Sequence, residues 1–272
     1  MLIDTHAHLT QIENIDKCIV DAKNAGVNKI ISIGCNLEEI EKSIKLAEKY
    51  DNVYATAGLY PHDLESEAEI SMDEKFKRLE SFARHPKIVA IGECGLDYTT
   101  PHSPEIKRKR NEQIELFTKQ IEIARKLDLP VVIHSREATE DLVGIIKREM
   151  ARAPFRAVCH CFAEGKAVAK TLLDLNVMLS FTGIITYKNA ESVRDSVAFT
   201  PIENIMVETD SPYLIPHHAR SQGVKINAPE YVKLVAQKIA EIKEISLAEI
   251  EEFTSNNALN FFKLYDRSEK QI

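Results

Sequence analysis

Short runs of β-branched and other apolar residues alternate along this chain with longer segments in which apolar residues recur every three or four positions. Alternation of this kind predicts strands that are separated by amphipathic helices. The predicted strands are Leu2–Thr5, Lys29–Ile33, Val53–Ala57, Ile88–Ile91, Val131–Ile133, Ala157–Cys159, Val177–Phe181 and Ile205–Glu208. Three further helices are predicted after the last strand, at Asn227–Lys243, Leu247–Phe253 and Ala258–Leu264.

Eight strand and helix units predict an α/β fold of the (β/α)8 TIM-barrel type. An open doubly wound sheet is the alternative, and it usually carries a Gly-rich phosphate-binding turn after its first strand. Here that place is taken by His6-Ala7-His8-Leu9-Thr10. We therefore expect a single barrel domain over residues 1–272, with the extra C-terminal helices completing its outer ring.

Composition limits the class of protein. The chain is 44% hydrophobic and 28% charged, and it contains neither a long apolar run nor the pattern of a secretory signal. We therefore expect a cytoplasmic protein with no membrane contact and no obligate protein partner. A net charge of −7 argues against nonspecific coating of nucleic acid, but it allows a nuclease with a small local phosphate site.

The cysteines do not suggest a disulfide framework, because five is an odd number and the expected compartment is reducing. We expect them to be buried as small apolar side chains. Cys159 and Cys161 flank His160, and strand alternation predicts that both point to the face opposite its imidazole.

Residues that bind metals recur where the predicted strands end. In a strand, alternate side chains share a face, so the side chains of His6 and His8 should project together, with Asp4 one step below them. The active site of a (β/α)8 barrel lies at the C-terminal ends of its strands. Six candidates have that position: His6, His8, Glu93, His134, His160 and Asp210.

Four imidazoles and two carboxylates are more than one tetrahedral ion needs. The set therefore predicts two divalent ions (Zn²⁺, Mn²⁺ or Mg²⁺), with a carboxylate such as Glu93 bridging them. Glu208 lies two residues before Asp210 and should also face the barrel interior. It could orient a metal ligand, bind a third ion, or bond only to neighbouring barrel side chains.

Several polar residues near the predicted rim are candidates for substrate binding. His62 and Asp97 are placed on loops there, and Tyr98 could stack on a base, as could Tyr187. Arg136 and Arg220 present planar guanidinium groups that suit phosphate oxygens. The basic run at 107–110 is interpreted as a solvated helix face, because no aromatic residue interrupts it.

Five segments together resemble one known family: Leu2-Ile3-Asp4-Thr5-His6-Ala7-His8-Leu9, Gly58-Leu59-Tyr60-Pro61-His62, Ile91-Gly92-Glu93-Cys94-Gly95-Leu96-Asp97-Tyr98, His134-Ser135-Arg136-Glu137-Ala138 and Val207-Glu208-Thr209-Asp210-Ser211-Pro212. The chain closely resembles the TatD family of metal-dependent deoxyribonucleases, within the amidohydrolase-like barrels. The resemblance implies that His6, His8 and Asp210 hold one ion, that His134 and His160 hold a second, and that Glu93 bridges the two. It also implies hydrolysis of DNA phosphodiester bonds, in several members as a 3′-to-5′ exonuclease on single strands.

Two positions depart from the family pattern. Tyr60 stands where many relatives have histidine, and Thr10 stands where an acidic residue is common. The leading hypothesis is cleavage of single-stranded DNA by water that two metal ions activate, with Asp210 accepting a proton. The alternative is hydrolysis of an ester, lactone or amide, including D-aminoacyl-tRNA, at the same site.

Overall fold

All eight predicted strands are present, and they form one parallel sheet whose spatial order follows the chain. The computed structural model describes residues 1–62, 70–99 and 108–264. The strands are β1 (Leu2–Ala7), β2 (Val27–Ser32), β3 (Val53–Ala57), β4 (Ile88–Asp97), β5 (Val131–Arg136), β6 (Ala157–Cys159), β7 (Val177–Phe181) and β8 (Ile205–Val207). Because the strands are parallel, their C-terminal ends all lie at the same end of the sheet.

The first and last strands meet, so the sheet is nearly closed. Ala7 pairs with Ser211 just beyond β8. The His8 amide donates to the Ser211 carbonyl at 2.8 Å, and the Asp210 amide donates to the His6 carbonyl at 2.9 Å. The expectation of a (β/α)8 barrel is confirmed.

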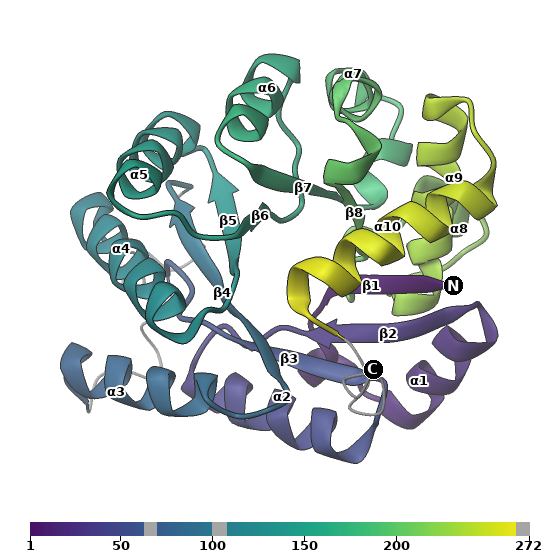
Figure 1. Cartoon of the computed structure of the whole chain (residues 1–272). Coiled ribbons are helices and arrows are strands. Elements are labelled where there is room, and N and C mark those ends of the chain that lie inside the picture. The colour runs from purple at the N-terminus through teal and green to yellow at the C-terminus, as the bar shows by residue number, and fades with distance from the viewer. Residues whose placement is uncertain (63–69, 100–107, 265–272) are drawn as a thin grey trace, which may run out of the picture.

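Helices surround this sheet (Figure 1). They are α1 (Ile15–Asn24), α2 (Leu37–Lys49), α3 (Met72–Ala83), α4 (Arg110–Leu127), α5 (Thr139–Arg152), α6 (Lys166–Asp174), α7 (Glu191–Phe199), α8 (His217–Ser221), α9 (Val232–Lys243) and α10 (Leu247–Phe262). Four begin at a polar side chain that accepts a backbone amide, namely Asn14, Asn36, Ser71 and Ser246. Within the described residues, no helix is long and apolar enough to cross a membrane.

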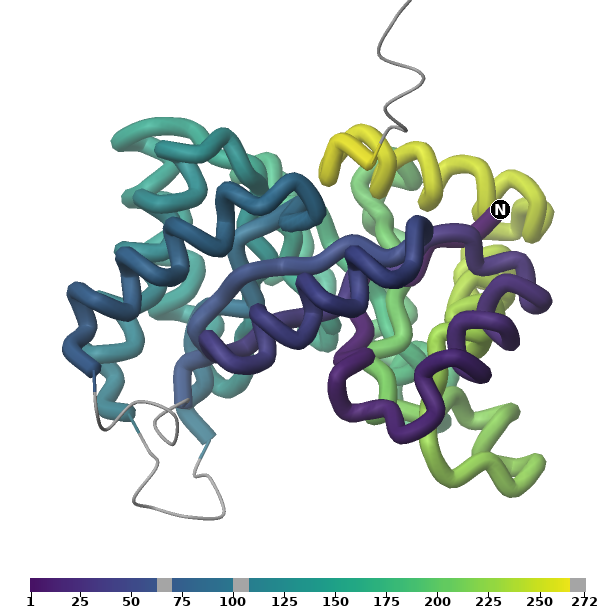
Figure 2. The backbone as a smooth tube through the Cα atoms, turned by 90° about the horizontal axis from the view of Figure 1, so that it is seen from below, coloured from purple at the N-terminus to yellow at the C-terminus, as the bar shows by residue number. Residues whose placement is uncertain are grey.

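An apolar layer inside the barrel, to which strands around the sheet and the end of the last helix contribute, forms a second core. It includes Ile3, Ile31, Val132 and Met206, against which Phe262 of α10 packs. Helix α10 therefore covers one end of the barrel, and the short helix α8 lies at the opposite end of the molecule (Figure 2). The chemistry predicted above is found at the end where the strands finish.

The C-terminal region differs from the prediction in its helix boundaries. Val232–Lys243 is helical, but the two helices predicted after it are one continuous helix, α10. Two hydroxyls between the predicted helices are bonded in the structure: that of Thr254 donates to the Ile250 carbonyl at 2.7 Å, and that of Ser255 donates to the Met1 carbonyl at 2.7 Å. Because both hydroxyls have acceptors, the helix continues through them.

Candidate metal centre

The end of β1 places the side chain of His6 inside the barrel, although the side chains of this strand do not alternate regularly between its two faces. The pairing of β1 with β2 is irregular between Asp4 and Ala7. As a result, the Thr5 hydroxyl also faces inward and donates to the Val207 carbonyl at 3.1 Å. The Asp4 carboxylate instead accepts the amide and hydroxyl of Thr209, at 2.9 and 2.5 Å. The prediction that Asp4 lies one step below the histidines on their face is wrong.

Glu93 is placed by glycines on both sides of it in β4. A Cβ on Gly92 would lie 2.5 Å from the Val132 carbonyl oxygen, and one on Gly95 would lie 2.1 Å from that of His134. Both glycines have positive φ, so a side chain is excluded there for two reasons. They allow β4 to approach β5 closely and to continue six residues beyond its predicted end at Ile91.

One carboxylate oxygen of Glu93 faces the β1 histidines. Its Oε2 lies 3.4 Å from His6 Nε2 and 3.8 Å from His8 Nε2. Asp210, in the turn after β8, closes this group, because its Oδ1 is 3.3 Å from His8 Nε2 and 3.6 Å from His6 Nε2.

The other oxygen of Glu93 faces a second pair of histidines. Its Oε1 lies 2.7 Å from His134 Nδ1 and 3.0 Å from His160 Nε2. The imidazole of His160 also stacks on that of His6, with ring centroids 3.9 Å apart. All six predicted ligand residues therefore come together, and Glu93 lies between the two groups.

The charges at this centre are strongly coupled. Burial alone would raise the pKa of Glu93, but the charge of His160 and hydrogen bonds from His134 and His160 hold it well below its usual value. Burial lowers the pKa of His6, and repulsion from His160 lowers it further. The carboxylate is thus ionised in a buried place, where positive charge on the neighbouring imidazoles or on a bound cation compensates it.

The donor set fits divalent cations. His6 is fully buried, yet neither of its ring nitrogens forms a hydrogen bond within the described residues. Two nitrogen or oxygen ligands of one tetrahedral ion lie about 3.3 to 3.6 Å apart, because each is about 2.0 to 2.2 Å from the ion. The distances from Glu93 Oε2 and Asp210 Oδ1 to His6 Nε2 have this length. Two groups of described residues could each hold an ion: His6, His8 and Glu93, and Glu93, His134 and His160.

Glu208 contacts the ring of a candidate ligand. Its Oε1 accepts the Cys161 amide at 2.6 Å and lies 3.2 Å from His160 Nδ1. A carboxylate on one ring nitrogen of histidine directs the other nitrogen to a metal. This geometry supports the interpretation that Glu208 orients a ligand. His6, His160 and Glu208 also form a group with metal-binding geometry, so a third ion remains compatible.

A tyrosine and an aspartate hold His134 in the same manner. Tyr60 donates its hydroxyl to Asp97 Oδ2 at 2.9 Å and lies 3.1 Å from His134 Nε2. Asp97 Oδ2 is 3.4 Å from that nitrogen. Asp97 is the last residue of β4 and is buried, so its predicted place on a rim loop is wrong. The departure at Tyr60 therefore lies against a candidate ligand.

The remaining predicted rim residues have mixed surroundings. His62 is buried, with Nε2 3.8 Å from an oxygen of Asp97. Tyr98 donates its hydroxyl to Asp141 at 2.6 Å. Arg136 ends β5 and is exposed, and the guanidinium of Arg220 lies 5.3 Å from the centre of the Tyr187 ring.

The basic run at 107–110 differs from its prediction. Residue 107 lies outside the described residues. Arg108 is buried and donates from Nε to the Pro61 carbonyl at 3.3 Å, so it is not part of a solvated helix face. The helix begins only at Arg110, whose guanidinium lies 4.3 Å from the centre of the Tyr98 ring.

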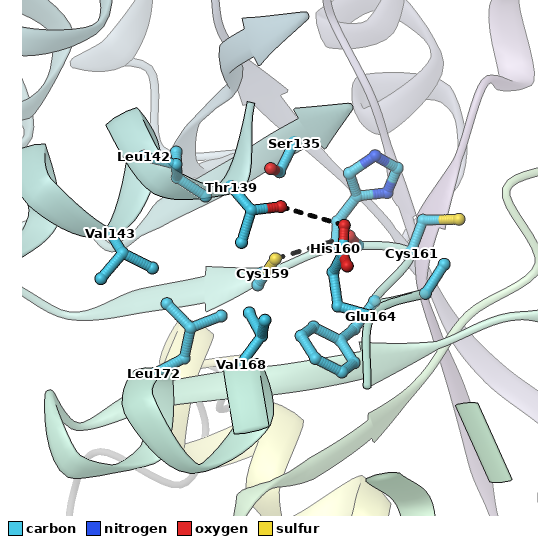
Figure 3. A pocket seen from close by; sticks show the side chains of 12 residues that line it. Ser135, Thr139, Leu142, Val143, Cys159, His160, Cys161, Glu164, Val168 and Leu172 are labelled. Atoms are coloured by element: carbon cyan, nitrogen blue, oxygen red, sulfur yellow. Dashed lines mark hydrogen bonds between the residues drawn. The ribbon is translucent and has the colours of Figure 1, made fainter. Parts of the chain in front are cut away.

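The two cysteines around His160 behave differently from each other. Cys159 packs in the main core, as predicted. Strand β6 ends there, and Cys161 has φ of +47°, so alternation no longer applies to it. All three residues 159–161 line a small pocket, in which the sulfur of Cys161 points away from that of Cys159 (Figure 3) and lies 3.6 Å from the Thr182 hydroxyl.

Two residues near the centre were missed from the sequence. Cys35, just beyond β2, lies with its sulfur 3.6 Å from Glu93 Oε2. The ring of Tyr213 lies 5.8 Å from that of His8 and is half exposed. The position of Cys35 shortly after a predicted strand was a usable signal, since each candidate ligand lies at or near the C-terminal end of a predicted strand.

Comparisons with known proteins identify the family of this chain. The chain matches the family described as TatD related DNase over residues 3–263. The chain belongs to this family. It is 38% identical to a protein of Bacillus subtilis (strain 168) named "Uncharacterized metal-dependent hydrolase YabD", over 97% of this chain and 100% of that protein. It is 31% identical to "3'-5' ssDNA/RNA exonuclease TatD" of Escherichia fergusonii, over 91% of this chain and 92% of that protein.

A solved structure gives the same result. The TatD homolog YJJV from Escherichia coli K12 superposes with a TM-score of 0.83 at 29% identity, covering 96% of this chain and 98% of that one. This TatD-related chain therefore shares the fold of its family along nearly its whole length, and it is a metal-dependent hydrolase.

Proposed function

We propose that this protein hydrolyses phosphodiester bonds of single-stranded DNA, with two divalent ions at the candidate metal centre. The observation that carries the proposal is the position of Glu93, whose two oxygens face different histidine pairs. His6, His8 and Asp210 would hold one ion, His134 and His160 would hold the other, and Glu93 would bridge them. Bound divalent ions would lower the pKa of water and neutralise charge on a phosphate.

The protein residues supply the remaining steps. Asp210 lies at the rim beside His8, where its carboxylate is placed to accept a proton from the attacking water. Burial raises its pKa, but the hydrogen bond from His8 and the charge of His6 hold that pKa below its ordinary value. The exposed guanidinium of Arg136 is placed to bind a phosphate oxygen at the end of β5. Arg220, His62 and Tyr98 are further candidates for substrate contacts.

The relatives support this choice of substrate. The protein from Escherichia fergusonii that is 31% identical to this chain is named a 3'-5' ssDNA/RNA exonuclease. We therefore propose the same 3′-to-5′ direction on single strands. Hydrolysis of a carboxylic ester, lactone or amide is the competing reaction.

Degradation of single-stranded DNA labelled at its 3′ or 5′ end tests the proposal, with Mg²⁺, Mn²⁺ or Zn²⁺ supplied in turn. We expect metal-dependent, stepwise shortening from the 3′ end, which EDTA stops and which Glu93→Ala lacks. Glu93→Gln is the matched variant, because it keeps the shape of the side chain and removes its charge. If the protein binds metal but cleaves no DNA, and instead turns over one of a panel of esters, lactones and D-aminoacyl-tRNA, the phosphodiesterase proposal is wrong.

A further inference from the structure

A thiol lies against the metal centre on its β2 side. Cys35 is half-buried, and its sulfur is 3.6 Å from Glu93 Oε2, the oxygen that faces the β1 histidines. Of the five cysteines, Cys35 is the one that belongs to a group with metal-binding geometry, together with His8 and Glu39. The ligand atoms of that group lie within 4.8 Å of one another.

The backbone holds Cys35 in this position. Its amide donates to Glu39 Oε2 at 3.2 Å, and its carbonyl accepts the Tyr60 amide at 2.8 Å. The preceding residue must be glycine, because a Cβ on Gly34 would lie 2.9 Å from the Thr56 carbonyl oxygen. The backbone of Cys35 is therefore held beside the centre by contacts on both sides of the turn.

A second observation points to a cation at the same place. His6 Nε2 is fully buried, has no hydrogen-bond partner among the described residues, and lies 3.4 Å from the Glu93 oxygen that the sulfur also faces. A sulfur and an oxygen at neighbouring positions of one zinc ion lie about 3.1 to 3.6 Å apart, because the bonds are about 2.3 and 2.1 Å long and the angle between them is about 90° to 109°. The thiol of Cys35 faces Glu93 Oε2 at 3.6 Å, which is at the upper end of this range.

We propose that Cys35 is an additional ligand of the ion that His6 and His8 hold, and that its sulfur makes this position select Zn²⁺ over Mg²⁺ and Mn²⁺. The inference rests on the two-ion centre of the proposed function. On binding, the S–H bond breaks, a metal–sulfur bond forms and one proton passes to water, with no change of oxidation state. Thiolate favours zinc and other soft ions, whereas Mg²⁺ and Mn²⁺ prefer oxygen ligands.

Cobalt absorption spectra test this ligand without measuring turnover. Metal-free full-length protein is titrated with Co²⁺, which reports its coordination in the visible range and thiolate bonding as a charge-transfer band in the near ultraviolet. We expect the charge-transfer band in the wild type and in Cys161→Ser, and its loss in Cys35→Ser. Cys161 is the matched control, because its thiol is also near the centre but belongs to none of the metal-binding groups.

The other outcomes separate failure of the sulfur ligand from failure of the metal centre. Visible cobalt bands without a charge-transfer band in the wild type would leave the metal centre standing and refute the sulfur ligand. A charge-transfer band that persists in Cys35→Ser would also refute it. Absence of any cobalt binding would refute the metal centre itself, and with it the proposed function.

A measurement on the wild-type protein tests the same sulfur ligand even if Cys35→Ser does not fold. Iodoacetamide modification is followed at each cysteine by peptide mapping, with Zn²⁺ or Mg²⁺ present. We expect Zn²⁺ to slow modification of Cys35 at least tenfold relative to Mg²⁺, while the rate at Cys161 changes less than twofold. Equal rates at Cys35 with the two ions would overturn the proposal. In folded Cys35→Ser, zinc affinity should fall at least tenfold while Mn²⁺ affinity changes less than threefold.

Discussion

Replacing Glu208 with glutamine should weaken the ion position formed by His134 and His160. The carboxylate is buried and lies 3.2 Å from His160 Nδ1, and it also accepts the Cys161 amide at 2.6 Å. Glutamine keeps the shape but loses the negative charge that stabilises the orientation of the imidazole. Substitutions of carboxylates that support metal-bound histidines cost about 10- to 100-fold in metal affinity, or about 1.4 to 2.7 kcal/mol.

The assay is competition for Zn²⁺ between the protein and a chromophoric chelator, which resolves two binding steps. We expect Glu208→Gln to weaken one step by 10- to 100-fold and to leave the other within threefold. Glu149→Gln is the control, because Glu149 is equally buried but bonds to Arg125 rather than to any ligand. It should lower the free energy of unfolding and leave both zinc affinities unchanged. If Glu208→Gln binds two zinc ions with wild-type affinity, the reasoning from the His160 contact is wrong.

Three further predictions concern Asp210, Tyr60 and Asp4. Asp210→Asn should lower kcat at least 100-fold while two ions remain bound, and near-normal turnover would exclude a role for this carboxylate in proton transfer. Tyr60→Phe removes the hydroxyl that bonds Asp97 and should weaken one zinc step about fivefold, or about 1 kcal/mol; unchanged affinity in the chelator assay would count against it. Burial raises the pKa of Asp4 to about 8, against about 3.9 in an unfolded chain. The protonated carboxyl therefore contributes fully to the free energy of unfolding below about pH 4, and this contribution is lost as the pH rises towards 8. In urea unfolding of the metal-free protein, the free energy of unfolding of the wild type should fall by about 1 to 3 kcal/mol relative to that of Asp4→Asn between pH 5 and 7. If the free energies of the two proteins change in parallel with pH, this prediction is wrong.

The barrel was predictable because its signal is repeated. Each strand is a short apolar run, and each is followed by a segment with helical periodicity, so eight units support one another even where a single boundary is wrong. The position of the ligand residues was predictable for the same reason. Parallel strands finish at one end, so residues at the ends of strands far apart in sequence, such as His6 and Asp210, had to meet.

What could not be predicted depends on local departures from regular structure. Alternation placed Asp4 beside His6, but the irregular pairing of β1 turned its carboxylate towards Thr209. Composition placed Cys35 in the core, although the turn after β2 directs its sulfur to Glu93. Arg108 was expected on a solvated face, but it is buried against the Pro61 carbonyl. In each case a contact across the fold decides the outcome, and of the three residues Cys35 alone had a signal in the local sequence, its position after a predicted strand.

The place where β1 meets the residues after β8, the seam of the barrel, can form only late in synthesis of the chain. His6 and His8 are synthesised before Asp210 and Ser211, so the backbone contacts of β1 with these two residues can form only once the growing chain extends past residue 211. Ions that bind on both sides of this seam would bind the native state and not a partial chain, and they would stabilise it in proportion to their concentration. Bound metal would then stabilise only chains that extend past residue 210, and products that stop earlier would lack this stabilisation and be degraded more readily.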